Sequence, residues 1–299
     1  SIFAHFGQTM TLERLAPSLF VALWSTGFIV AHYGTADAGP FTFLAVRMFV
    51  SAAVLWLIAV ATRAPRLERR HVTSSSIVGL LMHATYLGGV FFAISKGLPS
   101  GVSALIAGTH PVVTSFVGHW VLKERLRLVQ WCGVACGLGG VIAVLIERSS
   151  VKSATITTAT LVAMILAVIG MTTGTLVQRS RGQGMALLRG TAMQYVVAGI
   201  ALTLVAIFNE HWKMQNTLRN AFSVAWAVGV LSIAAVLLMM LLLSRHAAAK
   251  VSSLFFLTPA LSTIEGAILF SERLGALAVA GLFVSLAGVW LTQRNPAMQ

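Results

Sequence analysis

The sequence predicts an all-α integral membrane protein in which ten transmembrane helices form two inverted five-helix repeats around a central cavity. Composition points to the membrane first, because 57% of the residues are hydrophobic and only 10% are charged, with a mean hydropathy of +0.87. Ten apolar stretches follow one another along the chain. A block of the first half also recurs 148 residues later without a gap, which indicates duplication of a membrane unit.

The repeat is clearest around a proline and a charged triplet. Pro111 and Glu-Arg-Leu at 124–126 recur as Pro259 and Glu-Arg-Leu at 272–274, with twelve residues between proline and triplet in both copies. The same offset relates four further pairs: Gly133 and Gly281, Leu138 and Leu286, Gly140 and Gly288, and Val141 and Val289. We therefore expect one five-helix unit over residues 10–150 and a second, inverted unit over residues 151–299.

Each apolar stretch is about 20 residues long, enough to cross a hydrocarbon core of ~30 Å. Short connectors that are polar, charged or rich in glycine and proline separate them. In the first half the expected spans are residues 15–33, 41–62, 72–95, 101–122 and 129–146. In the second half they are residues 155–177, 186–208, 220–243, 251–270 and 276–293.

The nine residues before Met10 are expected to be an expression remnant or an extension outside the folded unit, and they carry none of the argument. The stretch at 15–33 continues directly into the repeat architecture and lacks a small-residue cleavage site. We therefore interpret it as the first span and not as a cleavable secretory signal.

Basic residues fall mainly in alternate connectors, which predicts the orientation because cytoplasmic connectors accumulate Lys and Arg. Fourteen lie in one set: Arg14, Arg63, Arg66, Arg69, Arg70, Lys123, Arg125, Arg127, Arg179, Arg181, Arg189, Arg245, Lys250 and Arg294. Six lie in the other: Lys96, Arg148, Lys152, Lys213, Arg219 and Arg273. Both termini are therefore expected in the cytoplasm, and two units of five spans must then be inverted. The net charge of +13 is explained by this topology and by anionic lipid, without a nucleic-acid partner.

Small residues surround the two cysteines in the fifth expected span. Cys132 and Cys136 interleave with glycines, and the glycines align with small residues in the tenth span. The aligned small positions are Gly133, Gly137 and Gly140 with Gly281, Ser285 and Gly288. Such spacing lets helices approach closely, so these two spans are expected to pack tightly or to dimerise.

The paired Pro…Glu-Arg-Leu blocks, with His110-Pro111 before the first and Gly140-Val141 after it, resemble the EamA-type branch of the drug/metabolite transporter superfamily. The sequence Trp-Ser-Thr-Gly at 24–27 and Arg47 in the second span are also similar to this family. Within it, the chain is most similar to YddG-type exporters of (aromatic) amino acids. The resemblance implies a basket-like bundle that exports metabolites by alternating access.

Prolines and ionisable residues inside spans are the candidates for movement and chemistry. Pro111 and Pro259 each remove a backbone hydrogen bond near mid-span, so they are hinge candidates or static bends. Arg47 and Glu265 are the charged residues within spans, where uncompensated charge is costly. They are expected either to pair with each other or to serve substrate and proton separately, while Arg47 alone could instead extend its charge to the interface.

Polar and aromatic side chains at mid-span predict a substrate cavity. His83 and His110 lie near the centres of the third and fourth spans, where a histidine can bind substrate, carry a proton or simply pack. The other cavity candidates are Trp24, Tyr86, Met171, Thr175 and Tyr195, each of which could instead pack between helices. Such a pocket favours a neutral amphiphilic molecule over a polyanion.

Motifs of other protein classes are absent from the sequence. It contains no HExxH, no GxSxG and no phosphate-binding GxxxxGK[ST], so we expect no enzyme activity, no cofactor and no metal. The prediction is a gradient-driven exporter of small neutral metabolites in a bacterial-type inner membrane, most similar in substrate to transporters of amino acids with aromatic or large apolar side chains. The alternatives are an exporter of other metabolites or drugs, a channel, a membrane-embedded enzyme, or a non-transporting scaffold.

Overall fold

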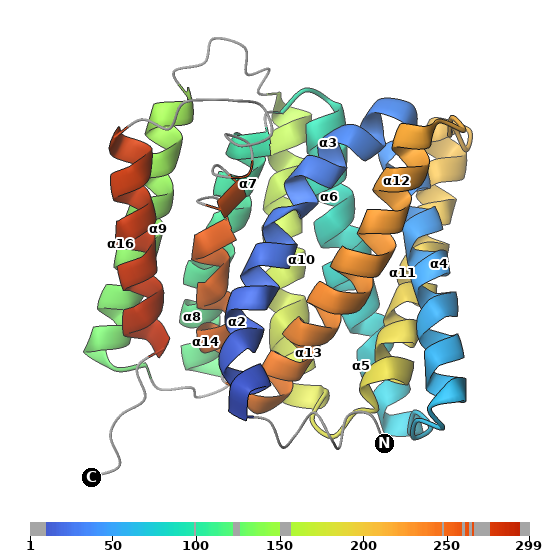
Figure 1. Ribbon diagram of the computed structural model, residues 1–299, viewed down its shortest axis with the longest axis horizontal. Helices are drawn as coiled ribbons and strands as arrows, with labels where there is room; N and C mark the ends of the chain where they lie inside the picture. Colours follow the sequence, from blue (N-terminus) through green and yellow to red (C-terminus); the bar gives the residue numbers. More distant parts are fainter. Residues whose placement is uncertain are drawn as a thin grey trace.

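The structure is a computed structural model that describes residues 10–98, 100–121, 126–149, 157–246, 248–258, 261–262, 265 and 276–293. These parts of the chain are helices and short connectors, with one isolated bridge between Ala38 and Met214. The long helices stand roughly parallel or antiparallel in one bundle (Figure 1). The fold is therefore all-α, as the sequence predicts.

The described part of the first half contains nine helical elements. They are α2 (Met10–Ser25), α3 (Gly27–Asp37), α4 (Pro40–Ala61), α5 (Arg69–Val78), η1 (Gly79–Tyr86), α6 (Leu87–Ser95), α7 (Ser100–Gly108), α8 (His110–Val121) and α9 (Leu128–Ser149). The second half contains α10 (Thr158–Arg181), α11 (Leu187–Glu210), α12 (Leu218–Trp226), η2 (Ala227–Ala235), α13 (Val236–Arg245), α14 (Ala248–Ser252), η3 (Ser253–Leu257) and α16 (Ala276–Gln293). Segments η1 and η2 are π-helical, and η3 is a 3₁₀ helix.

Within the described residues, six helical runs are long and apolar enough to cross a membrane. They are Leu15–Asp37, Pro40–Ala61, Arg69–Ser95, Thr158–Arg181, Leu187–Glu210 and Leu218–Arg245. Two shorter apolar helices are Leu128–Gly140 and Val279–Thr292. The structure therefore confirms a multi-pass membrane protein, and the exact number of ten spans stays a prediction.

Helices α4 and α11 pack antiparallel, and their ends are fastened to each other. The Glu210 carboxylate at the end of α11 accepts hydrogen bonds from the backbone N–H groups of Phe41 and Thr42, at 2.9 and 2.8 Å, and from the Thr42 hydroxyl at 2.8 Å. These donors belong to the first turn of α4, where no intrahelical acceptor exists and negative charge is favourable. Gly39 allows this approach, because a Cβ there would lie 2.1 Å from the carboxylate.

Helices α9 and α16 pack against each other through the small residues singled out in the sequence. A Cβ on Gly133 would lie 2.7 Å from the Gly288 carbonyl oxygen, and one on Gly140 would lie 2.5 Å from that of Gly281. Each glycine therefore meets the repeat mate of the other. This exchange is what a two-fold relation between inverted halves produces, and the expected tight packing of these helices is confirmed.

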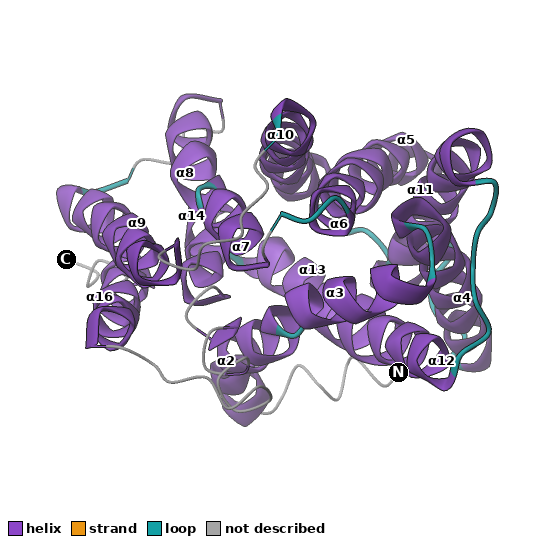
Figure 2. Cartoon of the chain, turned by 90° about the horizontal axis from the view of Figure 1, so that it is seen from above, coloured by secondary structure: helices purple, strands orange, loops and turns teal. Residues whose placement is uncertain are grey.

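Two π-helical segments interrupt the third and eighth expected spans at matched places. Segment η1 begins at Gly79 and η2 begins at Ala227, again 148 residues apart. A π-helix is rare and widens the helical turn, and it is often found at functional sites. Figure 2 shows α6, which continues η1, near the middle of the bundle, and α13, which continues η2, packs against α2.

Candidate functional site

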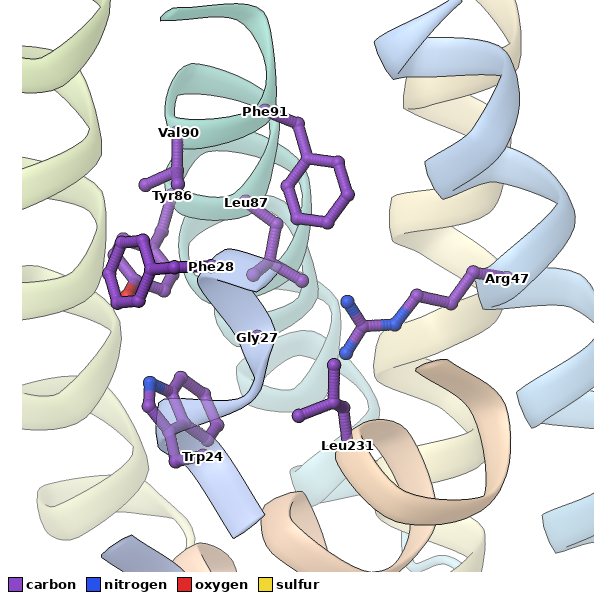
Figure 3. Close-up of a pocket in the computed structure, with 9 residues that line it drawn as sticks. All are labelled: Trp24, Gly27, Phe28, Arg47, Tyr86, Leu87, Val90, Phe91 and Leu231. Atoms are coloured by element: carbon purple, nitrogen blue, oxygen red, sulfur yellow. The ribbon is translucent and has the colours of Figure 1, made fainter. Parts of the chain in front are cut away.

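A buried pocket lies where elements from both halves meet. Its lining is Trp24 from α2, Gly27 and Phe28 from α3, Arg47 from α4, Tyr86 from η1, Leu87, Val90 and Phe91 from α6, and Leu231 from η2. Figure 3 shows these side chains gathered around one space. The cavity measures about 30 Å³, which is room for one or two water molecules and too little for an organic solute.

Aromatic rings form much of the pocket wall. The rings of Trp24 and Tyr86 stack with centroids 6.4 Å apart, and Phe255 meets Trp24 edge-on at 5.3 Å. Trp24 and Tyr86 are buried, and Phe91 adds another aromatic surface on the α6 side. The wall thus offers apolar faces to the body of an amphiphilic molecule.

Arg47 is the charged group of the pocket. Its side chain is 3% exposed, and its Nε donates a hydrogen bond to the Ser232 hydroxyl at 2.8 Å. Figure 3 shows its two terminal nitrogens pointing toward the space between Gly27, Leu87 and Leu231. Among the described residues, the ion pairs within 4.0 Å are Arg70 with Glu68 and Arg219 with Asp37. No carboxylate of the described residues forms an ion pair with Arg47. Arg47 therefore does not extend its charge to the membrane interface in this structure, because its side chain points into the pocket.

A chain of buried polar groups continues behind Arg47. The Tyr195 hydroxyl donates to the Ser232 carbonyl oxygen, and the Tyr195 ring meets the His83 ring edge-on at 4.7 Å. His83 Nε2 lies 3.1 Å from Gln194 Oε1, so this nitrogen is the donor, and Gln194 Nε2 donates to Gln178 Oε1 at 3.1 Å. These hydrogen-bonded side chains link η2, α11, η1 and α10, and they lie outside the pocket lining.

Glu265 lies beside the break between α2 and α3. The Ser25 hydroxyl donates a hydrogen bond to Glu265 Oε1, and the Ser262 hydroxyl donates to the Ser25 carbonyl oxygen at 3.0 Å. Within the described part of the chain, Glu265 Oε2 is buried without a hydrogen-bond partner. Arg47 and Glu265 therefore bond to different hydroxyls and do not pair with each other in this conformation. That they serve substrate and proton separately stays a prediction.

His110 lies next to the aromatic wall and outside the pocket. Its ring meets Phe255 edge-on at 5.1 Å, its Nε2 lies 3.5 Å from the Ser252 hydroxyl, and its Nδ1 has no partner among the described residues. Met171 and Thr175 are buried in α10 and do not line the pocket. The structure thus brings Trp24, Tyr86 and Arg47 together. In this conformation His110, Met171 and Thr175 are packed outside the pocket lining.

The helix break at Pro111 agrees with the chemistry of proline. Helix α7 ends at Gly108 and α8 begins at His110, so the helix is interrupted at Thr109. Pro111 has no N–H to donate to the carbonyl oxygen of Ala107, four residues earlier. Pro259, its repeat mate, lies outside the described residues. Whether either proline acts as a hinge stays a prediction.

Several pocket residues were not singled out from the sequence. They are Gly27, Phe28, Leu87, Val90, Phe91 and Leu231, together with Ser232, which accepts a hydrogen bond from Arg47. One signal points to the second-half member, because Leu231 lies 148 residues after the predicted cavity residue His83, although His83 itself lies outside the pocket lining. The apolar members carry no such signal, since most residues of every span are apolar.

A helical membrane bundle of two related halves, with a polar group buried in a pocket lined from both halves, is an architecture typical of membrane transporters of small molecules. The chain belongs to the EamA-like transporter family, whose family model matches residues 15–146 and 158–294. The two separate matches correspond to the two halves of the bundle.

Similar proteins include both named and functionally uncharacterised transporters. The chain is 22% identical over 282 residues to a "Probable amino-acid metabolite efflux pump" of Salmonella typhimurium, covering 91% of this chain and 92% of that protein. It is 21% identical over 291 residues to "Uncharacterized transporter sll0355" of Synechocystis, covering 93% and 88%. The match to "Uncharacterized transporter YoaV" of Bacillus subtilis, at 26% identity, spans only 40% of this chain and 41% of that protein.

A solved crystal structure has the same overall fold. It superposes on this chain with a TM-score of 0.76 at 18% sequence identity, covering 95% of this chain and 96% of the other. At that level of identity the likeness concerns the fold alone. It indicates that the arrangement of helices is one already seen in an experimental structure.

Proposed function

We propose that this protein exports small neutral metabolites, namely amino acids with aromatic or large apolar side chains, across a bacterial-type inner membrane. The observation that carries the proposal is the pocket, whose aromatic wall of Trp24, Tyr86 and Phe91 faces a single cation. An apolar wall with one polar handle suits an amphiphilic solute. The Salmonella protein's name, an amino-acid metabolite efflux pump, supports the same substrate class.

Transport would proceed by alternating access, with the present conformation a nearly closed one. A cavity of about 30 Å³ cannot hold an amino acid, so the pocket must widen for binding. Its lining comes from the first half and, through Leu231, from the second half. Motion of one half relative to the other would therefore change the volume directly.

The moving parts are proposed to be the interrupted helices. Segments η1 and η2 each place a residue in the pocket, Tyr86 and Leu231, and their wide turns are easier to deform than a regular α-helix. Pro111, with Pro259 in the second half, is proposed to add a bend in the neighbouring helices. Energy would come from a gradient of the substrate or of protons.

The basic connectors support a cytoplasmic location for the end of the bundle at which α2 begins. Connectors at that end carry the larger set of Lys and Arg residues, for example Arg63, Arg66, Arg181 and Arg189. The connector between α11 and α12 lies at the opposite end and carries Lys213 alone.

Transport by purified protein in liposomes tests the proposal. Labelled phenylalanine, tryptophan, leucine and glycine would be loaded inside or outside, with and without an imposed pH gradient. We expect saturable movement of the three large amino acids and little movement of glycine. Absence of protein-dependent movement for every amino acid would refute the substrate class, and an export assay of other metabolites and drugs would then test the alternative.

A further inference from the structure

We infer that Arg47 selects the transported molecule by its carboxylate, which the guanidinium would bind inside the aromatic pocket. The inference rests on the proposed function, because it supposes that the substrate enters this pocket. It goes further by stating which chemical group every good substrate must carry. A molecule with the same apolar body and no carboxylate is then a poor substrate.

The donor geometry of Arg47 is the first argument. A guanidinium has five N–H groups, and the one on Nε is used by the Ser232 hydroxyl at 2.8 Å. The terminal nitrogens carry the remaining donors and point toward the pocket space in Figure 3. Two parallel N–H groups of this kind match the two oxygens of a carboxylate.

The charge of Arg47 is the second argument. Its side chain is 3% exposed, and the carboxylates that form ion pairs in the described part of the chain are engaged elsewhere, Asp37 with Arg219 and Glu68 with Arg70. A buried cation without an anion is costly in a membrane protein. A bound anionic group would supply the missing charge.

The surroundings decide which anion fits. The pocket wall around the guanidinium is apolar and aromatic, and it contains no second cation among its lining residues. A phosphate monoester with two negative charges would leave one charge uncompensated in this wall. A single carboxylate on an apolar body leaves none, so amphiphilic carboxylates are the favoured class.

The position of Arg47 is fixed from the second half of the chain. Arg47 belongs to α4, whereas Ser232 belongs to η2, and the Ser232 carbonyl oxygen accepts a hydrogen bond from Tyr195. The guanidinium is thus held across the boundary between the halves. A carboxylate bound there would contact a group whose orientation depends on both halves. Alternating access requires the substrate to bind at such a boundary between the halves.

A ligand series on the wild-type protein tests the inference without any substitution. Exchange of labelled phenylalanine in liposomes would be measured against unlabelled phenylalanine, 3-phenylpropionate, phenylalaninamide and phenethylamine. The first two competitors carry a carboxylate and the last two do not. We expect the compounds without a carboxylate to inhibit about tenfold more weakly or worse, as for loss of a charge-assisted hydrogen bond. Equal inhibition by phenylalaninamide and phenylalanine would overturn the inference.

Variants separate charge from shape. Arg47→Gln should weaken inhibition by phenylalanine and make it no stronger than inhibition by phenylalaninamide. Arg47→Lys should keep part of this difference in inhibition, because the positive charge remains. The matched control is Arg66→Gln, which removes an exposed arginine of the connector after α4 and should leave the difference intact. Thermal unfolding in detergent identifies any variant that fails to fold, and the wild-type series remains decisive in that case.

A binding measurement separates this inference from the proposed function. Benzoate and benzamide share a ring and differ in the charge of the head group, and thermal stabilisation of the detergent-purified protein can be measured for both. Stabilisation by benzoate in wild type and not in Arg47→Gln, with no amino-acid transport, would retain the carboxylate site and refute the substrate class. Amino-acid transport with equal stabilisation by benzoate and benzamide would retain the substrate class and refute the carboxylate site.

Discussion

Arg47 and Tyr195 stand 148 residues apart, at the offset of the internal repeat, and both bond to Ser232. The Arg47 Nε donates to the Ser232 hydroxyl at 2.8 Å, and the Tyr195 hydroxyl donates to the carbonyl oxygen of the same residue. Corresponding positions of the two halves therefore converge on one residue of η2. The two partners differ in chemistry, so the pocket is asymmetric although the fold is repeated.

Removing the Tyr195 hydroxyl should loosen η2 beside the pocket. In Tyr195→Phe the Ser232 carbonyl oxygen loses the hydrogen bond that the Tyr195 hydroxyl donates, which costs about 0.5–1.5 kcal/mol. Ser232→Ala is the comparison, because it keeps the carbonyl and removes only the hydroxyl that Arg47 uses. We expect Tyr195→Phe to lower thermal stability and keep the carboxylate preference, and Ser232→Ala to lower the carboxylate preference as well. Similar behaviour of the two variants would contradict this division.

The contact between α9 and α16 should tolerate no side chain at Gly140. A Cβ there would lie 2.5 Å from the Gly281 carbonyl oxygen and 2.3 Å from the Ser285 hydroxyl oxygen. Gly140→Ala is therefore expected to lower the free energy of unfolding by about 1–3 kcal/mol, as overpacking does. Gly139→Ala, one residue earlier, meets nothing within 4 Å and is the matched control. Melting in detergent should separate the two variants, and equal melting temperatures would refute the close packing.

Glu210 should stabilise the bundle through the first turn of α4. Glu210→Ala removes an acceptor of three hydrogen bonds, and we expect a loss of about 1–2 kcal/mol, as for a lost helix cap. Glu210→Gln retains one acceptor oxygen and should lose less. Hydrogen exchange of the backbone amides of Phe41 and Thr42 reports on the site directly. Unchanged protection in Glu210→Ala would show that the carboxylate does not hold these amides.

Glu265 is the candidate for coupling transport to protons. Its Oε1 accepts from Ser25, while Oε2 is buried without a partner in the described part of the chain. Glu265→Gln cannot exchange a proton, so uptake driven by an imposed pH gradient should fall to the level seen without one. Glu68→Gln, which changes an exposed carboxylate, is the control. A normal gradient response in Glu265→Gln would assign the energy source elsewhere.

The repeat, the helical fold and part of the site could be predicted from sequence because each has its own signal. The offset of 148 led to the contact of α9 with α16, and buried charge singled out Arg47. The aromatic wall was predicted in part through Trp24 and Tyr86. These signals are local in the chain, or they repeat along it.

The facing of side chains could not be predicted in the same way. His110, Met171 and Thr175 are buried within the helical bundle, yet they do not line the pocket in this conformation. A count along a span gives depth, whereas facing depends on helix rotation, and spans that are apolar on all sides carry a weak periodic signal. The π-helical turns were missed for the same reason, because they change the period locally without changing composition.

The matched places of η1 and η2 bear on the history of the chain. A π-helical turn amounts to an extra residue accommodated in an α-helix, so a turn gained by only one half would shift that half by one position. The two segments begin 148 residues apart, at Gly79 and Ala227, and the offset is still 148 after them, at Gly140 and Gly288. Equal spacing at the start of the turns and after them is what remains when an ancestral half already containing the turn is duplicated. The irregularity is therefore older than the two-halved protein, and both descendants have inherited it.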